Sequence, residues 1–189
     1  MTERKRLPIG IQTFREIREA NHYYVDKTGH IRQLVDSGKH YFLSRPRRFG
    51  KSLLLDTFKE LFEGNESLFR GLEIHQHWDW SVQYPVLRFS FGRKNYRQPQ
   101  ALGEALHQQL TQFEENFQLE RRFDDAGSRF ADLLEKIKAQ TGLSIVVLID
   151  EYDKPILDAL EYPEIAKTNR DFLRGFYATI KDFDAHIRF

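Results

Sequence analysis

The sequence contains no cysteine and one methionine among its 189 residues. Without cysteine, the chain can form no disulfide and offers no thiolate to a metal or a substrate. Such a chain suits a reducing compartment, so we expect a cytoplasmic protein. The longest aliphatic run covers only residues 145–149, whereas a membrane helix needs about 20 apolar residues. The first ten residues also lack the apolar segment of a secretory signal. We therefore expect no membrane partner.

Charges of opposite sign gather in different parts of the chain, although the net charge is only +1. Residues 1–51 carry 12 Lys and Arg against 5 Asp and Glu, and the remainder carries 17 against 23. A basic segment is either a solvated face or a surface that meets the phosphates of a nucleotide or a nucleic acid. The composition leaves both interpretations open.

Helix and strand patterns alternate along the chain. Apolar residues recur at spacings of three and four, which predicts helices, in segments 28–37, 52–62, 99–118, 128–140 and 168–184. Strand patterns cover segments 40–44, 85–91 and 144–150. The last of these is a continuous β-branched run, as in a buried parallel strand. We therefore predict an α/β fold with a parallel sheet sandwiched by helices.

Segment 44–52 reads SRPRRFGKS and ends like a phosphate-binding loop. The pattern G-x-x-x-x-G-K-[ST] expects glycine at position 45, where Arg45 stands instead. The predicted strand before the loop and the predicted helix after it are the context that the motif requires. Backbone N–H groups at such a helix start would surround a phosphate. The predicted phosphate-binding residues are Arg47, Arg48, Phe49, Gly50, Lys51, Ser52 and Leu53.

A second, acidic motif follows the buried strand pattern at 144–150. Asp150 and Glu151 would emerge at the carboxyl end of this strand, where open α/β sheets bind their ligands. Ser52 and Asp150 would hold a Mg²⁺ ion. Lys51 would grip the outer phosphates of ATP, and Glu151 would polarise the attacking water as a general base. An ordinary strand followed by surface acids explains this motif alone, but both motifs in this order favour a nucleotide site.

Four segments together resemble the AAA-ATPase-like family of prokaryotic proteins. They read YYVDKTGHIRQLV, FLSRPRRFGKSLLLDTFKELFEG, YPVLRFSF and VVLIDEYDKPI, and they occur in this order over nearly the whole chain. The resemblance implies a P-loop NTPase core of the AAA type with ATP and Mg²⁺ as cofactors. It also implies that Arg45 is a family trait. Many members carry a further nuclease-like domain of the PD-(D/E)xK type, so a nucleic acid is a candidate partner. A second copy of the chain is another candidate partner.

The resemblance also predicts how the chain is organised. We expect an N-terminal segment at 1–38 with a short helix and an ATPase core at 39–189. In ATPases of this type, the strand after the acidic one lies between it and the loop strand and carries a sensor of the γ-phosphate. Residues 185–189 only begin such a strand. We therefore expect a C-terminally truncated member of the family.

Several alternatives stay open. The chain could be a non-catalytic binding module, linked to nucleic acid through its basic first quarter, or a small-molecule kinase. His75, His77 and Asp79 could hold a metal, but a surface cluster is favoured because no further ligand has recognisable spacing. Segment 26–28 either lies near the nucleotide base, as the resemblance allows, or caps the helix predicted at 28–37.

Overall fold

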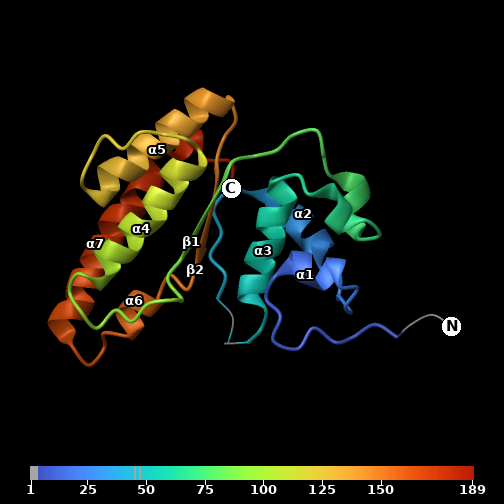
Figure 1. The fold of residues 1–189 in the computed structure, drawn as a ribbon, viewed down its shortest axis with the longest axis horizontal. Coiled ribbons are helices and arrows are strands. Elements are labelled where there is room, and N and C mark those ends of the chain that lie inside the picture. Colours follow the sequence, from blue (N-terminus) through green and yellow to red (C-terminus); the bar gives the residue numbers. More distant parts are fainter. Residues whose placement is uncertain (1–3, 45, 47) are drawn as a thin grey trace. The chain divides into compact units, whose positions relative to one another are not determined.

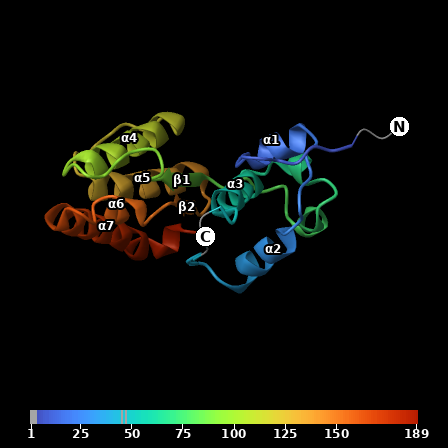
Figure 2. The same ribbon diagram turned by 90° about the horizontal axis from the view of Figure 1, so that it is seen from below.

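The computed structural model describes residues 4–44, 46 and 48–189. Two compact units divide the chain: unit 1 comprises Met1–Val86 with Phe189, and unit 2 comprises Leu87–Arg188. The described residues form seven α-helices, three short 3-10 helices and one sheet of two strands (Figures 1 and 2). They make a mixed α/β fold, and the larger predicted sheet sandwiched by helices is not formed by these residues. Each unit is described by itself.

Unit 1 is helical. Its helices are α1 (Phe14–Glu19), α2 (Thr28–Ser37) and α3 (Lys51–Phe62), followed by the 3-10 helices η1 (Glu66–Phe69) and η2 (Glu73–His77). The predicted helices at 28–37 and 52–62 are therefore confirmed. Apolar side chains from all five elements form a buried core that includes Phe14, Ile17, Ile31, Phe58, Leu61, Phe62, Phe69 and Ile74. Burial of this apolar surface provides the main stabilisation of the unit.

Two polar contacts fix α1 on α3. The buried carboxylate of Asp56 accepts a hydrogen bond from the backbone N–H of Phe14 at 2.6 Å. Arg15 donates to the carboxylate of Glu60 at 2.7 Å. Phe14 N–H belongs to the first turn of α1 and has no intrahelical acceptor, so Asp56 satisfies a donor that the helix cannot. Helix α1 therefore contacts the later turns of α3 through Asp56 and Glu60. The predicted phosphate loop leads into the first turn of α3.

Asp26 closes the start of α2. Its Oδ1 accepts from the backbone N–H of Thr28 at 2.8 Å and from the Thr28 hydroxyl at 2.7 Å. Its Oδ2 accepts from the backbone N–H of Glu73 at 2.7 Å. Burial opposes ionisation of Asp26, but these hydrogen bonds outweigh burial and lower its pKa. Asp26 thus lies one residue before the N-cap, Lys27, and binds the first residue of α2, whereas Lys27 itself makes no side-chain cap hydrogen bond.

The strand predicted at 40–44 is wrong, because these residues form no strand. A strand needs a neighbouring strand for its backbone groups, and the sheet of the described residues contains only β1 and β2. The aromatic side chains that suggested a strand lie at the surface, and Phe42 is 69% exposed. Tyr41 instead donates its hydroxyl to the carbonyl of Leu34 at 2.6 Å and lies against the ring of Phe189.

Unit 2 packs long helices against the sheet. The helices are α4 (Ala101–Asn116), α5 (Ala126–Thr141), α6 (Lys154–Leu157) and α7 (Pro163–Asp182), and η3 is Asp184–His186. Strands β1 (Val86–Ser90) and β2 (Val146–Asp150) run parallel. The predicted helices and the last two predicted strands are confirmed, although α7 begins five residues earlier than expected. The main core contains Leu87, Phe89, Leu106, Leu110, Phe130, Leu133, Leu134, Ile137, Ile145 and Phe176.

The end of the chain pairs with the residue before β2 through one isolated bridge. Ile187 forms a parallel bridge with Ile145. The N–H of Ile145 donates to the carbonyl of His186, and the N–H of Arg188 donates to the carbonyl of Ile145, both at 2.7 Å. The strand expected to begin at 185–189 is represented in the structure by this single bridge. This pairing also anchors the beginning of β2, so that its other end carries the acidic motif.

Candidate functional site

Gly50 turns the chain into α3. It occupies the position before the helix with φ of +75°, and its carbonyl accepts from the N–H of Leu54 at 2.9 Å. A Cβ placed on Gly50 would meet no atom of the described residues within 4 Å. The backbone conformation, not a lack of space, therefore favours glycine here. Because Gly50 has no side chain and the first turn contains no acidic residue, the helix dipole and its first N–H groups can act on an anion.

The residues beside Gly50 carry the remaining predicted phosphate contacts. Lys51 and Ser52 are the first two residues of α3 and are partly buried. Phe49 and Arg48 are exposed, and Arg48 has φ of +66°. A positive φ is uncommon outside glycine and collects at ligand sites. Leu53 follows in the same helical turn, whereas Arg47 and Arg45 lie outside the described residues.

Asp150 ends β2 in unit 2. It is buried, and its carbonyl accepts from the N–H of Phe91 at 3.1 Å. Its carboxylate Oδ2 lies 3.5 Å from the guanidinium of Arg88, which projects from β1. This ion pair places a positive charge beside the predicted metal ligand. The sequence does not reveal Arg88 as a partner, because the contact depends on the pairing of two strands about 60 residues apart.

Glu151 leaves the strand in an unusual conformation. It is exposed and has φ of +52°. A Cβ placed on Gly92 would lie 3.1 Å from Cδ of Glu151, so the carboxylate rests over a position that has no side chain. Gly92 is a residue that sequence reasoning missed. The only signal was a glycine just after the predicted strand at 85–91.

The segment after the acids is tied to the loop after β1. Helix α6 begins at Lys154 with Pro155 in its first turn. The Lys154 ammonium donates to the carbonyl of Lys94 at 2.8 Å and also pairs with Asp158. These contacts fix the backbone just after Glu151.

The predicted site residues thus fall into two groups. Gly50, Lys51 and Ser52 meet at the start of α3 in unit 1, and Asp150 and Glu151 meet at the end of β2 in unit 2. Within the described ranges, no group of three or more His, Cys, Asp or Glu side chains could hold a metal. His75 instead lies 3.1 Å from Glu66, and Asp79 accepts hydrogen bonds from Ser81. These contacts are those of a surface cluster.

Comparison with known proteins identifies the family. The profile of the AAA-ATPase-like family, described as "Predicted AAA-ATPase", matches residues 8–189. The chain belongs to this family. The AAA-ATPase-like resemblance drawn from the four sequence segments is therefore confirmed, and family membership indicates nucleotide binding.

A curated relative comes from Azotobacter chroococcum mcd 1 and is described as "Uncharacterized protein in vnfD 5'region". It is 56% identical over 187 residues, which cover 98% of this chain and 36% of the relative. The chain thus spans about a third of the length of this relative. No solved structure matches the chain. Among the described residues, no helix has the length and apolar character needed to cross a membrane.

Proposed function

We propose that the chain is the ATP-binding core of a Mg²⁺-dependent ATPase, with residues 39–189 as the core after an N-terminal segment. The observation that carries the proposal is the start of α3. There, Gly50 in a left-handed conformation is followed directly by Lys51 and Ser52. A helix of 12 residues with this start offers N–H groups, a dipole and a side-chain ammonium to one anion. Membership of the AAA-ATPase-like family supports ATP as that anion.

Four side chains have specific roles in this proposal. Lys51 binds the outer phosphates as a point charge. The Ser52 hydroxyl and the Asp150 carboxylate supply oxygen ligands of the kind that Mg²⁺ prefers. When bound, Mg²⁺ would neutralise the charge that develops on the phosphates. The exposed carboxylate of Glu151 would accept the proton of the attacking water.

A substitution of Glu151 tests the hydrolytic step. We expect Glu151→Gln to bind Mg-ATP normally and to release phosphate about 100-fold more slowly, because a positioned general base contributes roughly 10²–10⁴-fold. Glu161→Gln, an exposed residue in the turn before α7, is the matched control and should keep the wild-type rate. Phosphate release that is equal in both variants would remove Glu151 from the mechanism.

A non-catalytic nucleotide-binding module is the second candidate, and one contact favours it. The Asp150 carboxylate lies 3.5 Å from Arg88, so a metal would have to compete with this guanidinium. Under this alternative, the wild-type chain binds ATP but releases no phosphate above background. A second copy of the chain and a nucleic acid stay proposed partners of the whole protein, and the cytoplasm stays its proposed compartment.

A further inference from the structure

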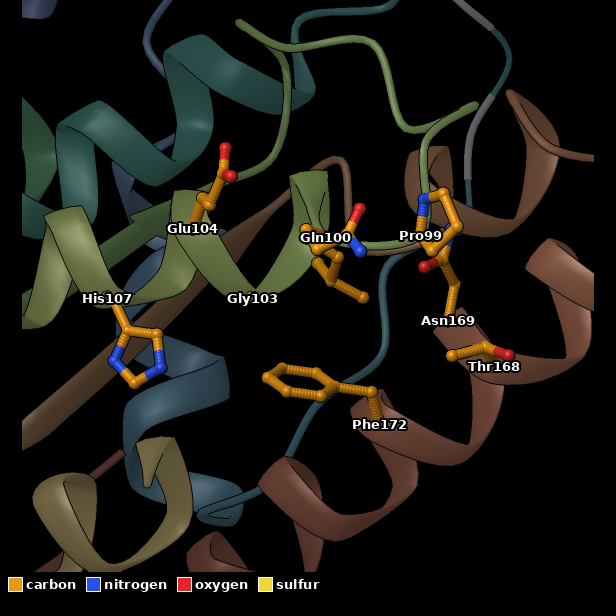
Figure 3. A pocket seen from close by; sticks show the side chains of 9 residues that line it. Pro99, Gln100, Gly103, Glu104, His107, Thr168, Asn169 and Phe172 are labelled. Atoms are coloured by element: carbon orange, nitrogen blue, oxygen red, sulfur yellow. The ribbon is translucent and has the colours of Figure 1, made fainter. Parts of the chain in front are cut away.

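A pocket of about 400 Å³ opens in unit 2 between the first turns of α4 and the middle of α7 (Figure 3). Its volume lies in the range of small-molecule sites, roughly 300–1,000 Å³. The side of α4 contributes Leu102, Gly103 and His107, and the side of α7 contributes Asn169 and Phe172. None of these residues belongs to the proposed ATP site. The pocket therefore needs its own explanation.

The amide of Asn169 has a fixed orientation. The residue is 1% exposed, and its Nδ2 donates to the carbonyl of Pro155 at 2.8 Å and to that of Tyr96 at 3.2 Å. Because both amide hydrogens are used, Oδ1 must point the other way. Figure 3 shows this oxygen turned toward Gln100. The hydrogen bonds of the described residues give Oδ1 no donor, so it offers an acceptor to the pocket.

His107 offers the complementary donor. Arg129, which is 2% exposed, donates from Nη1 to Nδ1 of His107 at 2.9 Å. A guanidinium has no acceptor, so Nδ1 must accept and the ring proton must sit on Nε2. Burial of the ring and the charge of Arg129 both lower the pKa of His107, which keeps the ring neutral. Figure 3 shows one ring nitrogen turned away from the pocket and the other turned toward Phe172.

A buried network holds Arg129 in place. Its Nε donates to the carboxylate of Glu114 at 3.0 Å, and its Nη2 donates to the hydroxyl of Thr111 at 2.9 Å. A guanidinium held by three partners has little freedom to release His107. The donor on Nε2 is therefore preorganised before any ligand arrives.

Gly103 adds no side chain to the wall that it forms beside Phe172. A Cβ placed on Gly103 would lie 3.9 Å from the Phe172 ring, an ordinary contact, so packing does not require glycine here. Glycine inside a helix is unfavourable relative to alanine. Gly175 in α7 is a second helical glycine with no neighbour within 4 Å, so a glycine alone indicates no site. At position 103, however, the glycine lines the same pocket as the Phe172 ring.

We propose that this pocket binds an uncharged, planar aromatic or heteroaromatic molecule. Its ring would stack on Phe172, an acceptor atom would meet Nε2–H of His107, and a donor would meet Oδ1 of Asn169. None of the lining residues is Lys or Arg, and Glu104 lies at the pocket, so a phosphate or carboxylate ligand is disfavoured. The site is thus chemically distinct from the phosphate loop and extends beyond the proposed ATPase function.

The test uses the full chain and 4-hydroxybenzamide as the probe. This molecule is flat and neutral, with a carbonyl acceptor at one end and a hydroxyl donor at the other. We expect saturable shifts of backbone amide resonances in a nuclear magnetic resonance titration, confined to the start of α4 and to residues 168–172. The Nε2–H resonance of His107 should move with the same binding curve. His107→Phe, which keeps a ring but removes the donor, should weaken binding by at least about threefold.

Gly103→Leu and Gly175→Leu form a matched pair. Both replace a helical glycine by a good helix former, and circular dichroism and urea unfolding check that both variants stay folded. Leucine at 103 fills the pocket and should weaken binding by at least about tenfold, whereas leucine at 175 should change it less than about twofold.

Three results would each overturn the proposal: no saturable shifts in the folded wild-type chain, shifts scattered over the surface, or equal binding by the Gly103→Leu and Gly175→Leu variants. Mg-ATP binding is measured on the same samples. Because Gly103 takes no part in the phosphate loop, the outcome for ATP is independent of the outcome for the pocket.

Discussion

At the scale of single residues, the backbone angle of Gly50 matters more than the space around it. An L-residue in the left-handed conformation costs about 1–2 kcal/mol, and Gly50 has φ of +75° with no atom near its missing Cβ. Alanine would therefore not clash, but it would resist the turn that starts α3. The first N–H groups of α3 and the Lys51 side chain would then no longer be placed to bind the same phosphate.

This predicts the effect of Gly50→Ala. Its free energy of unfolding should fall by about 1–2 kcal/mol, and its affinity for Mg-ATP should fall as well. Gly71→Ala is the control, because Gly71 has φ of +79° and equally open surroundings but lies outside the loop. The control should lose a similar amount of stability in urea unfolding while keeping ATP affinity. Equal ATP affinities of the two variants would contradict the role of the turn.

The sequence predicted some of these residues and missed others for a physical reason. Lys51, Ser52, Asp150 and Glu151 stand in local motifs, so their types and spacing were enough to nominate them. Gly92 approaches Glu151 only because two strands pair in one particular register. The contact between Arg129 and His107 joins two helices across 22 positions, and no local pattern encodes it.

At the scale of elements, helices were predicted well because their periodicity and caps are local. Helix α5 is an example, because the carboxylate of Asp125 accepts from the N–H of Ser128 at 2.8 Å and Gly142 ends the helix with φ of +70°. Both signals are visible in the sequence. The strand expected at 40–44 failed because a strand exists only with a partner, which a local pattern cannot supply.

The cap of α5 can be tested directly. Asp125→Ala should lower the free energy of unfolding by about 1 kcal/mol, the usual cost of losing an N-cap side chain. Asp124→Ala removes the neighbouring carboxylate, whose exposed ion pair with Arg121 should contribute little. Urea unfolding of both variants makes the comparison. Equal midpoints would show that the Asp125 hydrogen bond does not stabilise the helix.

At the scale of the whole molecule, the order of the motifs predicted the family correctly. The resemblance to the AAA-ATPase-like family came from a phosphate loop followed by an acidic strand, with the flanking segments in the same order as in the family. The match over residues 8–189 confirms it. The larger predicted sheet needs strands that pair with β2 and its neighbour. Within the described residues, β2 pairs only with β1, and the residue before β2 forms the bridge with Ile187.

The central claim is that the start of α3 binds the phosphates of ATP. Calorimetric titration of the full chain with Mg-ATP tests it most directly, with Lys51→Ala and Lys59→Ala compared on samples shown to be folded by circular dichroism. Lys59 lies on the same helix and pairs with Glu63 at 2.9 Å, so its removal deletes an equal charge elsewhere. We predict at least a tenfold loss of affinity for Lys51→Ala, since a hydrogen bond to a charged group contributes roughly 1.5–3 kcal/mol, and little change for Lys59→Ala. Unchanged binding by Lys51→Ala would contradict the account.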